Sequence, residues 1–138
     1  MAEAVFTQLV HEAHLQDFIE ADSAGTADWE MYSAPHPGTL YILGQNGIEY
    51  SGQGRKLLKA DLDSFDYIIT MDDENLRDVK KLGRGSATVA PLMSFVEGTD
   101  IREIPDPYFD NGFEIVYMLV QAGAQGLFKH IKVQHQIS

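Results

Sequence analysis

Hydrophobic residues recur every three or four positions in two stretches of the chain, which is the spacing of one face of a helix. Near the start, this spacing predicts an amphipathic helix over about residues 2–14, with an apolar stripe of Val5, Phe6, Leu9, Val10 and Ala13. Near the end, it predicts a long helix with an apolar stripe of Phe113, Val116, Tyr117, Val120, Ala124, Leu127, Phe128 and Ile131. Both helices are expected to bury one face against a core.

Three compact apolar runs predict β-strands. Tyr67–Met71 is rich in β-branched residues and is typical of a strand that is buried on both faces. Phe18–Ala24 alternates in part and leads into Gly25, and Ala87–Leu92 is a further short run. Because strands alternate with helices, the predicted fold is α/β: one three-layer domain over residues 1–138, with a short parallel sheet and helices on both faces.

Polar residues at the ends of segments predict the remaining helices. The acidic run at residues 72–74 suits a helix N-terminus, and the lysines at 80–81 followed by Gly83 suit its C-terminus. A weaker helix is predicted over residues 39–45, and a helical turn over residues 59–64.

The composition is that of an ordinary globular protein with an acidic excess. The chain has 138 residues, of which 44% are hydrophobic, and a formal net charge of −11. No apolar run approaches the roughly 20 residues that span a bilayer, and no signal segment opens the chain, so we expect a cytoplasmic protein without a membrane partner. The negative charge argues against nucleic acid, whose phosphates require Lys and Arg.

Cysteine is absent from all 138 residues. This excludes disulfides, thiolate metal sites and cysteine nucleophiles from the chain. No metal or cofactor is expected either. His11 and His14 are one residue short of the zinc-protease spacing, and Gly83–Ser86 lacks the lysine and the spacing of a nucleotide loop.

Asp106 is the strongest candidate for a catalytic residue. It stands between Pro105 and Pro107 and precedes Tyr108 and Phe109. The prolines restrict the backbone, so the carboxylate is presented in a fixed direction, as a general acid requires. A proline turn without a chemical role accounts for the same residues.

Three segments, Asp22–Thr26, Phe65–Asp72 and Ile104–Tyr108, together resemble the low-molecular-weight protein tyrosine phosphatases. The resemblance extends from Met1 to about Lys132. In that family, a strand and a Cys-(five residues)-Arg-Ser/Thr-Pro loop precede the helix with which this chain opens. The resemblance therefore implies an N-terminally truncated domain that lacks the central first strand and the phosphate-binding loop.

The resemblance also implies how a substrate would be held and cleaved. Asp106 would be the general acid that protonates the phenol leaving group, and then the base that assists hydrolysis of a cysteinyl phosphate. The substrate would be a phosphotyrosine protein or an aryl phosphate, held between aromatic walls formed by Trp29, Tyr108 and Phe109. Trp29 has a structural alternative, because a single Trp in a loop commonly anchors packing.

Two further residues would support the phosphate-binding loop by the same resemblance. Ser23 matches a serine that hydrogen-bonds this loop, although local turn bonding explains a Ser near Gly as well. Asp72 matches a carboxylate at a strand end, and a helix cap explains it equally well. The family histidine that helps to order the loop is replaced here by Gly52.

Loss of a central strand would leave two sheet edges unpaired, beside residues 18–24 and 67–71. Each orphaned backbone group costs about 1–3 kcal/mol, and a whole domain has about 5–15 kcal/mol of net stability. The flanking strands could pair, another chain could donate a strand, or the chain could be only partly folded. We expect a homo-oligomer formed by strand exchange.

These observations lead to three functional hypotheses. The first is a phosphatase that is inactive in this cysteine-free form, with the Tyr108-Phe109 pair favouring phosphotyrosine over phosphoarginine. The second is a non-catalytic paralogue that binds or scaffolds through exposed sheet edges. The third is an acidic α/β binding module that shares only ancestry with the family.

Overall fold

The structure of the protein is a computed structural model that describes residues 1–26, 37–48, 50, 55–105 and 112–137. Its elements are, in chain order, α1 (Ala2–Glu12), α2 (Pro37–Gln45), α3 (Asp61–Ser64), β1 (Tyr67–Thr70), α4 (Asp73–Leu82), β2 (Thr88–Pro91), the 3-10 helix η2 (Leu92–Phe95) and α5 (Phe113–Gln134). None of the described helices is long and apolar enough to cross a bilayer.

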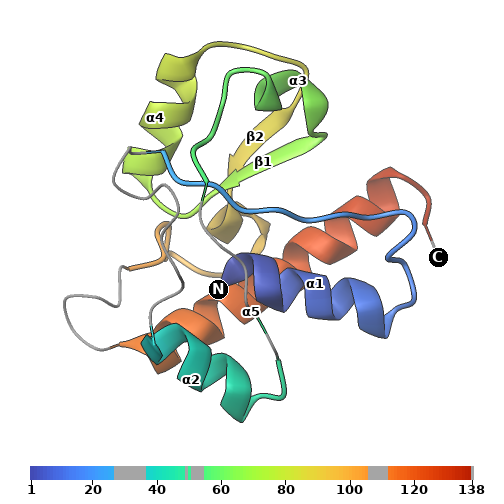
Figure 1. Ribbon diagram of the computed structural model, residues 1–138, viewed down its shortest axis with the longest axis vertical. Coiled ribbons are helices and arrows are strands. Elements are labelled where there is room, and N and C mark those ends of the chain that lie inside the picture. Colours follow the sequence, from blue (N-terminus) through green and yellow to red (C-terminus); the bar gives the residue numbers. More distant parts are fainter. Residues whose placement is uncertain (27–36, 49, 51–54, 106–111, 138) are drawn as a thin grey trace.

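The sheet of the described residues consists of β1 and β2, which pair in parallel with Tyr67 opposite Thr88. Ile68 of β1 is buried with Val79 of α4 in a small cluster on one face. Tyr67 and Ile69 pack on the opposite face, against the main core around α1 and α5. Figure 1 shows the sheet between these helices. The α/β class, with a short parallel sheet and helices on both faces, is confirmed.

The main core lies where α1 crosses α5. Its most deeply buried large side chains come from three elements, namely Leu43 of α2, Leu92 of η2 and Val120 of α5. The rings of Phe6 and Phe128 meet edge to face, with their centroids 6.0 Å apart. This core holds the two longest helices together and orients the start of α1 toward the sheet.

The predicted helices are present, with small shifts at their ends. The Asp72 carboxylate caps α4 by accepting a hydrogen bond from the Asn75 N–H at 2.7 Å. The same helix ends at Gly83, whose φ of 144° is accessible to glycine. The first helix ends two residues before the end of the predicted range of 2–14, since His14 has a φ of 58°.

One predicted strand is wrong. Residues 18–24 form no ladder, and this region has only an isolated parallel bridge between Gly25 and Lys56. An extended segment becomes a strand only when a neighbour supplies hydrogen bonds. No such neighbour lies beside residues 19–24 within the described ranges. The strands predicted at Tyr67–Met71 and Ala87–Leu92 are present as β1 and β2.

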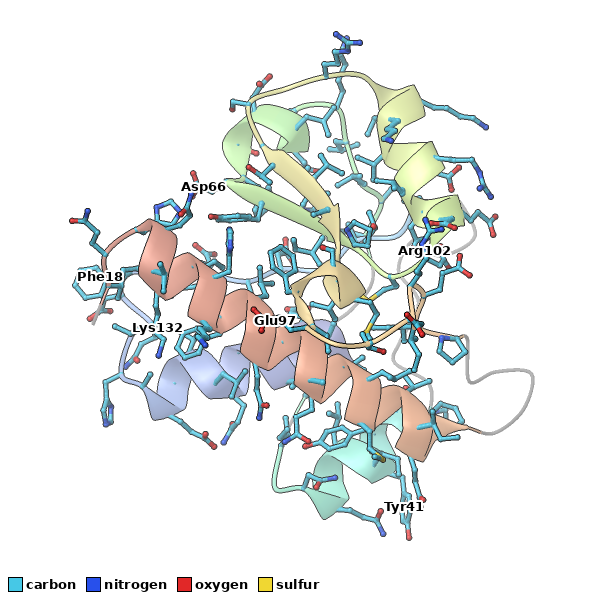
Figure 2. All side chains as sticks on the ribbon, turned by 180° about the vertical axis from the view of Figure 1, so that it is seen from behind. Phe18, Tyr41, Asp66, Glu97, Arg102 and Lys132 are labelled. Atoms are coloured by element: carbon cyan, nitrogen blue, oxygen red, sulfur yellow. The ribbon has the colours of Figure 1, made fainter. Side chains whose placement is uncertain are left out.

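Several large apolar side chains remain on the surface. Phe18 is 76% exposed and Tyr41 is 65% exposed. Figure 2 shows these two rings near opposite ends of α5, so they do not form one continuous patch. Residues 27–36, which include Trp29, lie outside the described residues.

Candidate functional site

The segments that carry the predicted site residues leave the described structure beside α4. Thr26, the last described residue before Trp29, donates a hydrogen bond from its hydroxyl to Asp78 of α4 at 2.9 Å. Before Asp106, the Ile104 N–H donates to the Met71 carbonyl at 2.9 Å, just ahead of α4. Trp29 and Asp106 themselves lie outside the described residues, as do Tyr108 and Phe109.

Both segments return to the described structure at a single place. Gly38, in the first turn of α2, packs directly on the ring of Phe113, in the first turn of α5. A Cβ on Gly38 would stand 2.5 Å from that ring, so any other residue would force the ring to shift. The residues that precede the two segments are thus held beside α4, and the residues that follow them are held where α2 meets α5.

The chain from Arg102 to Ile104 is fastened to the N-terminal end of α4. The Asp73 N–H donates to the Glu103 carboxylate at 2.8 Å, and Arg102 lies 3.7 Å from the Asp73 carboxylate. Figure 2 shows Arg102 beside this end of α4. Asp72, as the cap of α4, therefore lies where the Asp106 segment departs.

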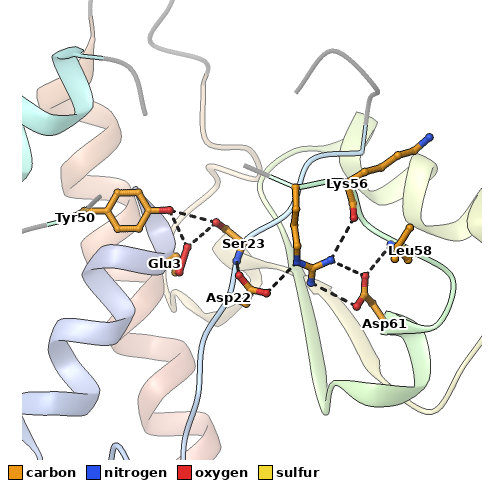
Figure 3. A network of polar contacts seen from close by, with 8 residues as sticks. Glu3, Asp22, Ser23, Tyr50, Lys56, Leu58 and Asp61 are labelled. Atoms are coloured by element: carbon orange, nitrogen blue, oxygen red, sulfur yellow. Dashed lines mark hydrogen bonds and ion pairs between the residues drawn. The ribbon is translucent and has the colours of Figure 1, made fainter. Parts of the chain in front are cut away.

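Ser23 belongs to a hydrogen-bonded group at the start of α1. Its hydroxyl donates to the Glu3 carboxylate at 2.6 Å, and the Tyr50 hydroxyl donates to the same oxygen at 2.8 Å (Figure 3). Burial raises the pKa of Tyr50, and the Glu3 charge acts in the same direction. The Ser23 hydroxyl thus joins two distant segments, beyond the local turn bonding that its sequence context suggested.

A second group adjoins the first through the Asp22–Ser23 backbone. The Arg55 guanidinium donates to Asp22 and to Asp61, at 3.0 Å in each case (Figure 3). The Leu58 N–H also donates to Asp61 at 2.7 Å. Burial acts to raise the pKa of Asp61, but the hydrogen bonds from Arg55 and Leu58 outweigh it and hold the pKa below its usual value.

These two groups contain residues that sequence reasoning missed, namely Glu3, Tyr50, Arg55 and Asp61. The contacts of Glu3 with Ser23 and Tyr50 span 20 and 47 positions, and that of Arg55 with Asp22 spans 33, so no local spacing announces them. The one available signal is Arg55, which is the single arginine between the first helix and α4. No three His, Asp or Glu side chains of the described part of the chain are placed to hold a metal ion.

Comparison with known proteins shows the family to which the chain belongs. The family model described as low molecular weight phosphotyrosine protein phosphatase matches residues 1–137. The chain belongs to this family. It is 37% identical over 140 residues to the low molecular weight protein-tyrosine-phosphatase YfkJ of Bacillus subtilis, a match that covers 99% of this chain and 90% of that protein.

Further comparisons show similarity in sequence and in structure. PtpA of Staphylococcus aureus is 35% identical over 133 residues, which cover 95% of this chain and 84% of that protein. The crystal structure of YfkJ superposes with a TM-score of 0.92, over 96% of this chain and 86% of that one. A Drosophila arginine phosphatase, 29% identical, superposes with a TM-score of 0.87 over 95% of this chain and 88% of that one.

Proposed function

We propose that this chain has the substrate-binding walls and the general acid of a phosphotyrosine phosphatase. We further propose that it does not hydrolyse phosphate esters in its 138-residue form. The observation that carries the proposal is that a member of this phosphatase family contains no cysteine. By the family resemblance, the nucleophile is a thiolate held in a loop whose amides and arginine bind the phosphate. Positioning and charge stabilisation supply most of phosphoryl transfer, and an acid alone cannot replace them.

Asp106 is proposed as the latent general acid, facing a cleft walled by Trp29, Tyr108 and Phe109. The anchoring of both segments supports this arrangement, because they leave beside α4 and return where Gly38 meets Phe113. Ser23 and Asp72 are proposed as supports of the same site.

The proposed substrate class is the phosphotyrosine side chain or another aryl phosphate. The relatives named protein-tyrosine-phosphatase favour this class. One structural neighbour is titled an arginine phosphatase, so phosphoarginine is the competing substrate. The Tyr108-Phe109 pair favours an aromatic ring, which can stack between aromatic walls.

Turnover of p-nitrophenyl phosphate tests the catalytic part of the proposal. We expect the rate with the purified chain to equal that of buffer, whereas the Bacillus subtilis relative, assayed in parallel, should give clear turnover. The matched control is Asp106→Asn, which should give the same rate as the unmodified chain. Turnover above buffer that Asp106→Asn abolishes would contradict the proposed inactivity.

A second candidate function is binding of another polypeptide through an open sheet edge. The observation that favours it is the position of β1, which has a strand neighbour on one side only within the described residues. Open edges are templates for strand addition, either by a second copy through strand exchange or by a different protein. The expectation of a cytoplasmic location stays a prediction.

A further inference from the structure

Five basic side chains gather at the end of the molecule that is formed by α3 and the C-terminal half of α4. The chain has ten Lys and Arg residues against 21 Asp and Glu, and half of these cations lie in this one region. Figure 1 shows α3, the end of α4 and the turn after it together, at the top of the view. We name the five residues the basic strip: Lys59, Arg77, Lys80, Lys81 and Arg84.

The side chains of the basic strip are exposed, and their charges are not neutralised within the described structure. None of the five makes an ion pair or a side-chain hydrogen bond with a described residue. By contrast, Arg55 is paired with two carboxylates and Arg102 with one. Since carboxylates outnumber cations about two to one in this chain, five adjacent cations without such a partner form a distinct positive surface.

The turn that carries Arg84 is fixed on α3. The Ala87 N–H donates to the Leu62 carbonyl at 2.8 Å. The Ser86 N–H donates to the Asp63 carboxylate at 3.0 Å. These two hydrogen bonds tie the chain after α4 to a second helix. Arg84 therefore stands on a supported backbone, and less conformational entropy is lost when its side chain binds a ligand.

The remaining members of the basic strip follow α4. Lys59 crosses the end of this helix, because its Cε lies 3.2 Å from the position that a Cβ of Gly83 would occupy. Arg77 lies three and four positions before the two lysines of the last turn, so these side chains are neighbours on the helix surface, about 5–6 Å apart. The strip thus runs along α4 and over its C-terminal end.

The helix dipole accounts for only part of the basic strip. Cations are favourable near a helix C-terminus, which explains Lys80 and Lys81 in the last turn. The effect is confined to that turn, so it does not reach Arg77 in the middle of the helix. Both arginines of the strip also carry the forked guanidinium that matches a carboxylate.

Carboxylates border the basic strip and limit the shape of its ligand. Asp73 and Glu74 occupy the first turn of α4, and Asp78 stands between Arg77 and the lysines along the chain. A broad anionic surface, such as a membrane or a nucleic acid duplex, would meet these carboxylates as well, and like charges repel. A single extended chain can follow the strip between them.

The surroundings of the basic strip favour a peptide over a single-stranded nucleic acid. Binding of single strands relies on aromatic rings that stack with bases. The exposed Phe and Tyr rings of the described residues belong to Phe18 and Tyr41, which Figure 2 shows far from α4. The apolar side chain beside the strip is instead Leu58, which is 57% exposed and adjoins Lys59.

We propose that the basic strip is the docking site for an extended acidic segment of a partner protein, with carboxylates at alternate residues. Alternate side chains of an extended chain lie on one side, about 6.5–7 Å apart, which is close to the spacing of the cations on α4. Leu58 supplies an apolar contact at one end of the site. Docking here goes beyond the phosphatase and sheet-edge functions proposed above and rests on neither.

Binding of a synthetic acidic peptide to the full chain, followed by NMR, tests the proposal. The probe has four Glu residues that alternate with Ser, and its ends are acetylated and amidated. The control peptide has Gln in place of each Glu. In low-salt buffer, we expect the probe to shift the backbone amides of Lys59 and of residues 77–86 saturably, and the control to bind at least about tenfold more weakly.

Two double variants with the same change in net charge separate the basic strip from general electrostatic attraction. Lys80→Gln/Lys81→Gln removes two charges from the strip, and Lys129→Gln/Lys132→Gln removes two from α5. We expect the first to weaken peptide binding about fivefold or more and the second to change it less than about twofold. Thermal unfolding by circular dichroism checks that both variants are folded.

Absence of peptide binding, or equal loss in both double variants, overturns the docking site. Sedimentation with vesicles of phosphatidylcholine and phosphatidylglycerol tests a lipid surface as the occupant, and we expect none. Sedimentation that Lys80→Gln/Lys81→Gln abolishes would replace the acidic segment by a membrane and overturn that part of the proposal. None of these measurements depends on phosphatase turnover, which tests the catalytic proposal separately.

Discussion

Asp61 is the most buried carboxylate of the group that Arg55 forms with Asp22 and Asp61, next to Ser23. It is 9% exposed, and it accepts hydrogen bonds from the Arg55 guanidinium and from the Leu58 N–H. A buried carboxylate is stable only when such partners replace water. Arg55 in turn holds Asp22, so that a single ion-paired group ties the extended segment to the start of α3.

The stabilising effect of Asp61 is expected to depend on pH. Since its folded-state pKa is lowered, the stabilisation is fully present above the unfolded pKa of about 4 and is lost as the pH falls through the folded value. Asp61→Asn should therefore cost about 1–3 kcal/mol of unfolding free energy at pH 7 and progressively less below about pH 4.

Urea unfolding of the two proteins between pH 7 and pH 3 measures this difference. The exposed Asp17 provides the matched control, and Asp17→Asn should change the unfolding free energy little at either pH. A cost of Asp61→Asn that is constant over this range would show that the ionised carboxylate does not stabilise the fold.

At the scale of elements, the packing of α5 on η2 requires glycine. A Cβ placed on Gly126 would overlap the Phe95 carbonyl oxygen, and one on Gly123 would stand 2.5 Å from Leu92. Glycine costs up to about 1 kcal/mol in helix propensity relative to alanine. Two such residues in the same helix therefore mark a close approach between the helix backbone and its neighbour.

Alanine substitutions in two helices should have opposite effects. Gly126→Ala is expected to destabilise the protein by about 1–3 kcal/mol, because overlap with the Phe95 backbone outweighs the gain in propensity. Gly44→Ala in α2 is the control, since nothing lies within 4 Å of a Cβ there, and it should stabilise by about 0.4–1 kcal/mol. Thermal unfolding of both variants checks the expectation, and stabilisation by Gly126→Ala would contradict the close contact.

At the scale of the whole molecule, the described structure has one large and one small apolar cluster. The large cluster joins α1, α2, η2 and α5, whereas the small one contains Leu62, Ile68 and Val79. The sheet lies between them, and within the described residues β1 has a strand partner on one side only. Stability is therefore expected to be highest around α5 and lower in the sheet.

Hydrogen exchange should reveal this distribution amide by amide. The amides around Val120 in α5 should exchange slowest, and those of Ile68 and Thr70, which face β2, should be protected as well. The amides of Tyr67 and Ile69 should exchange at least about tenfold faster, because they face the edge of β1 that has no strand partner among the described residues. Equal protection of all four strand amides, measured by NMR on the chain alone, would mean that this edge is covered in solution.

Local signals made several elements predictable from the sequence. The helix that begins after Asp72 has its cap, its acidic first turn and its glycine end within a few residues of each other. The apolar stripe of α5 is equally local, and the strands β1 and β2 are short apolar runs. The strand predicted at residues 18–24 failed because pairing depends on a distant neighbour.

The sequence by itself determined the family and the chemistry that the chain lacks, because motifs and the absence of cysteine are properties of residue identity. Only the tertiary structure decided where Ser23 directs its hydroxyl, which carboxylates Arg55 binds, and which edge of β1 pairs with β2. These features join residues that are far apart along the chain. Their energies depend on distance and burial in three dimensions, which no local pattern encodes.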